Sequence, residues 1–152
     1  MRNILFCFLI LIIGCTSHHE SATTTKSEQE KTVDAMRDLG TAVEAYKLAN
    51  NHYPVVSSGN VEELRDIFVP KYLKELRYHD GWGNKLEYYC LKQEGPYFII
   101  SLGSDKERDV DLYKTDRSPS GLGFKEIANL NEDIIFSNGV FVRYPKGTRV
   151  GA

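Results

Sequence analysis

Carboxylates gather in one stretch of the chain, where they could bind a metal ion. They are Asp105, Glu107, Asp109, Asp111 and Asp116, followed further along by Glu132 and Asp133. Hard cations such as Ca²⁺ take about six to eight oxygen ligands from carboxylates and backbone carbonyls. The alternative is an ordinary solvated loop, because Lys106, Arg108 and Lys114 lie among the acids. The residues alone leave both interpretations open.

Residue sets that would support catalysis are missing from the sequence. It contains no G-x-S-x-G nucleophile elbow. It also contains no phosphate loop, paired-cysteine zinc spacing or dinucleotide fingerprint. His52 and His79 belong to turn sequences, where histidines are more often surface residues than bases. Cys90 lies in a strand pattern, and a buried cysteine is usually inert. We therefore expect that the protein is not an enzyme.

Composition indicates one modest domain and gives no electrostatic reason to expect nucleic-acid binding. The 152 residues include 19 Lys and Arg against 21 Asp and Glu, and a near-neutral chain lacks a basic footprint. Of the three cysteines, Cys7 lies in the apolar start of the chain and Cys15 follows it. If Cys15 carries lipid, only Cys90 is left, so no internal disulfide can form.

The first fifteen residues have the pattern of a secretory signal. Arg2 supplies a positive charge, the run from Ile4 to Ile13 is apolar, and Gly14 and Cys15 close the segment. A cysteine directly after Ile-Ile-Gly resembles the lipobox of bacterial lipoproteins, which implies cleavage before Cys15 and diacylglycerol on its sulfur. The alternatives are a plain transmembrane anchor and an ordinary cleaved signal with a chance cysteine. As a helix the run would span only about half of a roughly 30 Å hydrocarbon core.

These features divide the chain into four segments. They are a lipoprotein signal peptide (1–14), a lipidated cysteine with a flexible tether (15–26), a globular domain (27–146) and a tail (147–152). The tether is predicted because residues 16–26 are polar and cannot bury a face. Lipid on Cys15 would attach the domain to a membrane, facing the periplasm or the cell surface. Thr16 is not the Asp that retains many lipoproteins at the inner membrane, which by analogy favours the outer membrane.

A long helix is predicted at the start of the globular domain. Ser27 can cap it with Glu30 as the capping-box partner, and Asn50 followed by Pro54 ends it. Its apolar residues recur at spacings of three and four, which gives one apolar stripe. The stripe consists of Val33, Met36, Leu39, Val43 and Tyr46. A short second helix is predicted over residues 61–68.

After the turn sequence 80–84 the apolar periodicity changes to that of strands. The predicted strands cover 86–91, 97–102, 134–136 and 140–144, with hairpin turns at Gly95-Pro96 and Asn138-Gly139. Residues 103–131 are predicted as a long loop with one helical turn near 124–130. The order of elements predicts an α+β fold. In it the long helix packs on a small antiparallel sheet, against Tyr88, Phe98 and Ile100.

Five motifs occur in an order that resembles a known family. They are Leu39–Lys47, Asn51–Pro54, Tyr72–Leu76, Trp82–Asn84, and Gly95–Tyr97 continuing to Ser101–Asp105. Together they resemble the soluble head of the major pseudopilin of type II secretion, the G-type pseudopilin. The likeness covers about 34–105 and returns at 133–144. It implies a type IV pilin-like head with a structural role in type II secretion or pilus-like assembly, and machinery proteins as partners.

The same resemblance implies roles for particular residues. It implies structural roles for five residues, namely Tyr53, Pro54, Trp82, Gly83 and Asn84. G-type pseudopilins bind calcium in the loop after the second strand. This implies Leu102 (through its carbonyl), Asp105 and Asp133 as ligands, with Asp109 and Asp111 as secondary candidates. The cofactor expected from the resemblance is therefore a calcium ion.

The chain departs from the pseudopilin pattern at its start. A pseudopilin leader is cut before a long apolar helix that packs in the filament centre, whereas the apolar segment here lies upstream of Cys15. Gly81 and Lys85 stand where the family commonly has proline, so we expect a looser turn. We expect the isolated head to be a monomer. Two functions stay open, a lipid-tethered accessory of secretion or envelope assembly and a free-standing lipoprotein that binds a ligand.

Overall fold

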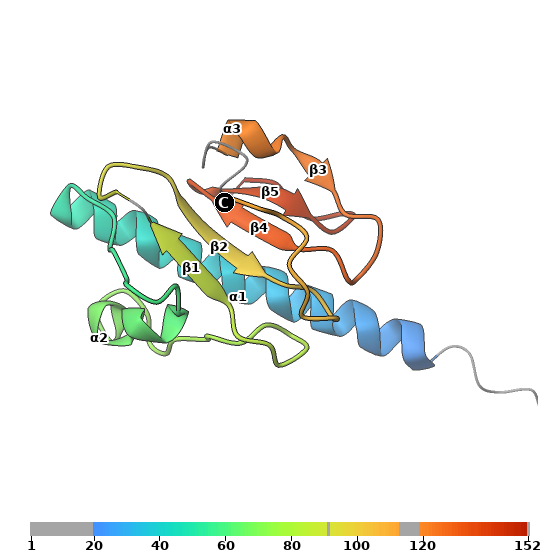
Figure 1. Ribbon diagram of the computed structural model, residues 1–152. Helices are drawn as coiled ribbons and strands as arrows, with labels where there is room; N and C mark the ends of the chain where they lie inside the picture. The colour runs from blue at the N-terminus through green and yellow to red at the C-terminus, as the bar shows by residue number, and fades with distance from the viewer. Residues whose placement is uncertain (1–19, 91, 113–118, 152) are drawn as a thin grey trace, which may run out of the picture.

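A long helix lies across one face of a five-stranded sheet in the computed structural model, which describes residues 20–90, 92–112 and 119–151 (Figure 1). The helical elements are α1 (Glu20–Asn50), the 3-10 turn η1 (Val61–Leu64), α2 (Arg65–Phe68) and α3 (Pro119–Leu122). The strands are β1 (Glu87–Cys90), β2 (Tyr97–Ser101), β3 (Lys125–Glu126), β4 (Ile134–Ser137) and β5 (Val140–Tyr144). They lie in the order β1-β2-β4-β5-β3, and the β3–β5 pair is parallel while the other pairs are antiparallel. The predicted α+β fold is confirmed.

Helix α1 begins earlier than the sequence predicts. It starts at Glu20 and not at Ser27, so residues 20–26, which the sequence analysis assigns to the tether, form the first turns of this helix. Residues 15–19 and the lipidation site lie outside the described residues. A helix whose packed half is already formed extends at low cost, because each added residue gains a hydrogen bond. In the described part of the chain, no helix combines the length and the apolar character needed to cross a membrane.

The apolar stripe of α1 packs on the sheet as predicted, but two of its predicted partners are wrong. Four stripe residues are buried in the main core with Tyr88, namely Val33, Met36, Leu39 and Val43. Phe98 and Ile100 lie in a second cluster instead. Tyr97 and Ile99 take their place in the main core, because successive residues of a strand point to opposite faces of the sheet.

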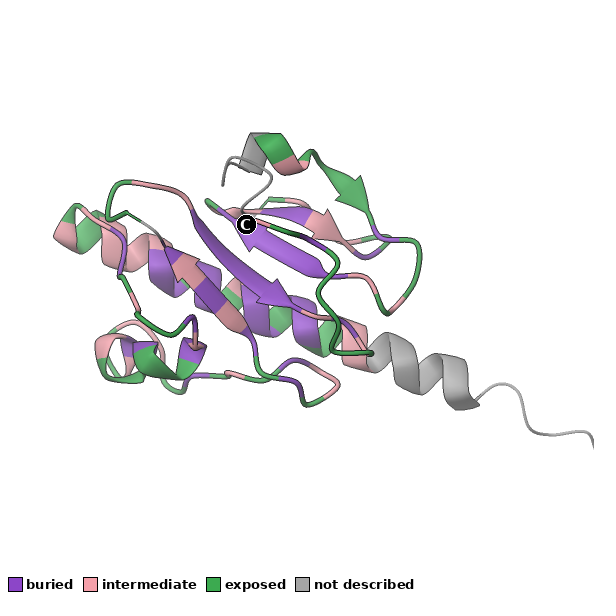
Figure 2. Cartoon of the chain, in the orientation of Figure 1, coloured by how far each residue is buried: buried purple, intermediate pink, exposed green. Residues whose placement is uncertain are grey.

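The second cluster covers the sheet face that points away from α1. Its buried members are Phe98, Ile100, Val110, Ile135 and Val142. Leu102, Leu112 and Leu122 are partly buried against them. Consequently β2 and β4 are buried along their whole length, as Figure 2 shows. The loop after β2 thus has a packing role, since it keeps water from apolar side chains of the sheet.

The two predicted hairpins are present. Strands β1 and β2 pair antiparallel, with Cys90 opposite Tyr97. Strands β4 and β5 are joined by Asn138 and Gly139, whose φ angles are 48° and 80°. Two successive positive φ angles are what a type I′ hairpin turn requires, and Asn-Gly is the sequence that adopts them most easily.

The C-terminal third differs from the prediction in two places. The helical turn predicted near 124–130 is wrong, because the helix is α3 and residues 125–126 form β3 beside β5. Strand β3 consists of two exposed residues, so the sequence contains no apolar alternation that could predict it. The segment predicted as a tail (147–152) belongs to the domain up to Gly151. There the Val150 carbonyl accepts the N–H of Phe141 at 2.6 Å, and Gly151 forms a bridge with Val140.

Candidate functional site

Two aspartates connect the loop after β2 to the start of β4. Asp133 Oδ2 accepts the backbone N–H of Asp109 at 3.1 Å and that of Val110 at 3.0 Å. In return, Asp109 Oδ2 accepts the N–H of Asp133 at 3.2 Å. Asp133 is fully buried, and its other oxygen, Oδ1, has no hydrogen-bond partner. The pair therefore holds the loop against the sheet and leaves one buried carboxylate oxygen unused.

Burial weakens the acidity of the Asp133 carboxyl group. Its pKa is raised to about 6, chiefly because burial disfavours the charged form, and the charge of Asp109 raises the pKa further. The two backbone N–H groups and the Arg108 guanidinium lower the pKa without offsetting burial. Arg108 is itself ion-paired with Glu87 on β1. The ionised form of Asp133 therefore lowers the stability of the folded state, unless a positive group in addition to Arg108 lies beside its carboxylate.

The other implied calcium ligands lie apart from this pair. Asp105 is exposed, and its Oδ1 accepts the backbone N–H of Glu107 at 3.0 Å. Asp111 is exposed, and Leu102 is partly buried on the second cluster. Among the described residues, no three His, Cys, Asp or Glu side chains lie close enough together to hold a metal ion. Of the implied ligands, the structure brings together Asp109 and Asp133.

A buried hydrogen-bond network centres on Asp80, which the sequence analysis missed. Asp80 Oδ1 accepts the N–H of Trp82 at 3.0 Å and that of Asn84 at 2.8 Å. Its Oδ2 accepts the hydroxyl of Ser101 at 2.8 Å. The network thus fixes the 80–84 turn to the end of β2. An aspartate that opens an Asp-Gly turn was the signal that could have identified it, because such side chains cap their own turns.

The 80–84 turn, predicted to be looser than in the family, contacts helix α1 closely. Gly81 donates its N–H to the Thr32 hydroxyl on α1 at 2.8 Å. A Cβ atom at position 81 would overlap the backbone carbonyl of Glu28, also on α1. Glycine at position 81 therefore allows the turn to contact the helix backbone, and its N–H makes a bond that proline could not make.

Replacing Gly81 with alanine should destabilise the domain by about 1–3 kcal/mol, as overpacking does. Either α1 or the turn must move to make room for the methyl group. Gly151→Ala is the matched control, because its Cβ would meet nothing within 4 Å and its φ is not in the left-handed region. Chemical denaturation followed by circular dichroism measures both. A Gly81→Ala variant as stable as Gly151→Ala would contradict the close contact.

The five residues assigned structural roles all lie at the helix–sheet seam or in the turn. Tyr53 is buried in the main core, and the Pro54 carbonyl accepts the Tyr88 hydroxyl at 2.9 Å. Trp82 is partly buried against the main core, and Gly83 has a left-handed φ. Asn84 is buried and donates its Nδ2–H to the Gly103 carbonyl at 2.8 Å. That last bond links the turn to the start of the acidic loop.

Other residues with reactive side chains have structural surroundings. Cys90 is buried, burial raises the pKa of its thiol, and its Sγ donates to the Lys92 carbonyl at 3.1 Å. The His52 ring lies edge-on to Tyr46 at the end of α1, and His79 is exposed. A raised thiol pKa lowers the thiolate fraction, so Cys90 is poorly suited to be a nucleophile.

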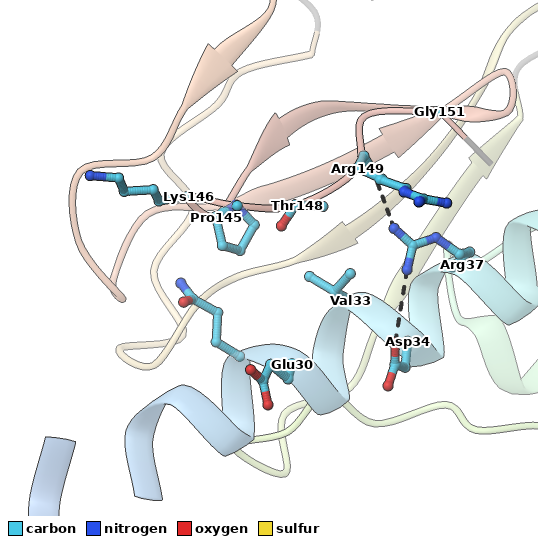
Figure 3. A pocket seen from close by; sticks show the side chains of 11 residues that line it. Glu30, Val33, Asp34, Arg37, Pro145, Lys146, Thr148, Arg149 and Gly151 are labelled. Carbon is cyan, nitrogen blue, oxygen red and sulfur yellow. Dashed lines mark hydrogen bonds and ion pairs between the residues drawn. The ribbon is translucent and has the colours of Figure 1, made fainter. Parts of the chain in front are cut away.

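A groove of about 820 Å³ runs between the first half of α1 and the segment after β5 (Figure 3). Glu30 and Asp34 line the helix side, while Lys146 and Arg149 line the other. Arg37 crosses the groove, because it lies 3.8 Å from the Asp34 carboxylate and donates to the Arg149 carbonyl at 3.2 Å. The ion pair of Arg37 with Asp34 thus lies within the helix wall, and Arg37 reaches the other wall through a hydrogen bond to a neutral carbonyl. The described residues that line the groove include no cysteine, histidine or serine.

Comparison with known proteins identifies one family. The family model described as type II secretion system (T2SS), protein G, matches residues 21–117. The type II secretion system core protein G of Aeromonas hydrophila is 33% identical over 95 residues, which cover 57% of this chain and 66% of that protein. The core protein G of Escherichia coli (strain K12) is 28% identical over 95 residues, 57% of this chain and 65% of the relative. The core protein G of Vibrio cholerae is 31% identical over 88 residues, which cover 53% of this chain and 60% of that protein. The chain thus spans just under two thirds of the length of these relatives.

Proposed function

Because the chain belongs to the type II secretion system protein G family, we propose that it serves type II secretion as a structural, non-enzymatic protein of the cell envelope. The family match over residues 21–117 carries this proposal. A long helix packed on a mostly antiparallel sheet is consistent with a pilin-like head. Its partners would be proteins of the secretion machinery, and the isolated head would be a monomer.

The proposal includes a lipid anchor on Cys15. The support is the sequence pattern of residues 1–15, in which a positive start and an apolar run lead to Ile-Ile-Gly-Cys. Helix α1 begins at Glu20, shortly after this cysteine, so the head would lie close to the membrane surface. Thr16 after the cysteine favours the outer membrane.

We also propose that the loop after β2 binds a hard cation such as Ca²⁺. The resemblance assigns Leu102, Asp105 and Asp133 to it, and the buried Oδ1 of Asp133, which lacks a partner, fits a ligand of this kind. When bound, the cation would neutralise the negative charge of ionised Asp133. This chain's own contribution is to hold the loop over the second cluster, through the Asp109 and Val110 amides.

Deleting the gene in its native host tests the secretion proposal. Secretion of proteins exported by the type II pathway should fall severalfold, and a plasmid copy should restore it. Deletion of a core gene of the same pathway is the positive control. Complementation with a Cys15→Ala copy separates the contribution of the anchor from that of the head. Normal secretion in the deletion strain would contradict the proposal and favour a free-standing ligand-binding lipoprotein.

A further inference from the structure

We infer that a cavity beside strand β1 binds a small acidic sugar. The cavity has a volume of about 660 Å³, which lies within the usual range for sites of small ligands. Three segments form its walls, namely the loop before η1, the 83–89 segment that includes most of β1, and the start of the loop after β2. Side chains that carry the argument are Ser58, Asn84, Lys85, Tyr89, Leu102 and Lys106.

Positive charge in the described lining of the cavity is available to an anion. Lys85 and Lys106 are both exposed and line the cavity. Lys85 lies 3.6 Å from the Glu62 carboxylate, but these side chains are 59% and 44% exposed, so the pair contributes little. Glu87, the carboxylate among the described lining residues, is ion-paired with Arg108. A carboxylate that enters the cavity therefore meets two ammonium groups, and the acidic side chain beside them is already paired.

Asn84 adds an unused hydrogen-bond acceptor to the wall. Its side chain donates Nδ2–H to the Gly103 carbonyl at 2.8 Å, and the residue is 7% exposed. Its Oδ1 has no hydrogen-bond partner among the described residues. A buried polar atom without a partner is unfavourable. A ligand that carries hydroxyl groups supplies the kind of donor that this oxygen lacks.

Tyr89 gives the cavity an aromatic wall whose ring is held in place. The Arg108 guanidinium lies 5.6 Å from the ring centroid. A Cβ atom at Gly59 would lie 2.9 Å from Cε1 of the ring, so the backbone at this position packs directly against it. Leu102 adds further apolar surface. Small-ligand sites typically combine such apolar and aromatic surface with a few polar groups that fix orientation.

The backbone beside the cavity favours a compact ligand over an extended peptide. Leu86 donates its N–H to the Tyr78 carbonyl at 2.9 Å, and Tyr88 donates its N–H to the Gly59 carbonyl at 2.8 Å. A peptide that adds to a sheet edge needs such backbone groups unpaired. The ligand must therefore bind mainly through side chains. A carboxylate for the lysines, hydroxyl groups for Asn84 and an apolar ring face for Tyr89 together describe an acidic sugar.

Titration with glucuronate tests the inference, with glucose as the neutral sugar of the same ring. NMR spectra of the ¹⁵N-labelled full-length protein measure binding, in the presence of chelator so that no calcium ion bridges sugar and protein. Glucuronate should shift the amide signals of Gly59, Lys85, Leu102 and Lys106. Its Kd should be on the order of 10⁻³ M, because a ligand of this size gains limited free energy per atom. Glucose should bind severalfold more weakly, since it lacks the carboxylate.

Four substitutions of exposed charged residues locate the site. Lys85→Gln and Lys106→Gln should each raise the Kd for glucuronate by about threefold, the effect of losing one exposed charge pair. Glu62→Gln should lower the Kd by about twofold, because it frees Lys85 from a competing carboxylate. Lys92→Gln is the matched control, since Lys92 is an exposed lysine outside the lining, and it should leave the Kd unchanged. The NMR spectrum of each variant shows whether the fold is retained.

Several outcomes would overturn the inference. They are equal binding of glucose and glucuronate, an unchanged Kd in both lysine variants of the lining, and the absence of any shift at the cavity. An acetylated triglutamate peptide that shifts the same signals at lower concentration than glucuronate would also overturn it, in favour of an acidic peptide. Neither the proposed role in secretion nor the proposed calcium binding depends on these results, because they rest on other observations.

Discussion

Replacing Cys15 with alanine should abolish lipid attachment and leave an unprocessed or soluble protein. A diacylglycerol on the cysteine sulfur contributes about 0.8 kcal/mol per buried methylene group, and two acyl chains together give stable anchoring. Without the thiol, the lipid cannot be attached and cleavage before residue 15 does not follow. Metabolic labelling with a radioactive fatty acid measures lipid attachment. Membrane fractionation measures anchoring, and the mass of the intact protein shows whether the signal has been cleaved.

Cys7→Ala is the matched control for this experiment. Cys7 lies in the apolar run of the signal and is the same residue type, but it is not preceded by Ile-Ile-Gly. This variant should keep the label, the processed mass and the membrane fraction of the wild type. A Cys15→Ala protein with unchanged mass and unchanged membrane fractionation would refute the lipoprotein proposal.

Replacing Leu39 with alanine should destabilise the domain by about 2–5 kcal/mol, the cost of removing a large buried side chain and leaving a cavity. Leu39 is 1% exposed and belongs to the main core. The neighbouring Gly40 brings the helix backbone against the Phe136 ring, where a Cβ atom would overlap the ring. The helix is thus already in close contact with the sheet there and cannot move inward to fill the cavity.

Leu48→Ala is the control on the same helix. Leu48 is 84% exposed, so its truncation should change the free energy of unfolding by no more than about 0.5 kcal/mol. Urea denaturation followed by circular dichroism measures both variants. Leu48→Ala should lower the free energy of unfolding by less than about 0.5 kcal/mol. If Leu39→Ala lowers it by as little, α1 is not packed on the sheet at this point.

The candidate cation site could be predicted only in part from the sequence. The acidic residues of the loop indicated a possible metal site without ranking its members, and the resemblance to G-type pseudopilins selected Asp105 and Asp133, with Asp109 and Asp111 as secondary candidates. Asp109 and Asp133 are 24 positions apart, and they meet because β4 pairs with β2, with Ile134 opposite Ser101. That pairing places the residue before β4 beside the loop that leaves β2. The sequence carries no local signal for such a long-range contact.

Local features of the chain were determined by the sequence itself. The spacing of Val33, Met36, Leu39 and Val43 identified the buried face of α1, since a helix repeats every 3.6 residues. Asn138-Gly139 identified the β4–β5 hairpin, because few residue pairs adopt two positive φ angles in succession.

Three other features were decided only by the tertiary structure. The short strand β3 has no pattern of its own and exists because β5 offers it a partner. The assignment of Phe98 and Ile100 to the second cluster depends on which face of β2 meets α1. A continuous apolar run such as 97–100 does not specify that face, because every residue in it is suited to burial. The Asp80 network likewise joins residues far apart in sequence, and its bonds form only once helix, turn and sheet have packed together.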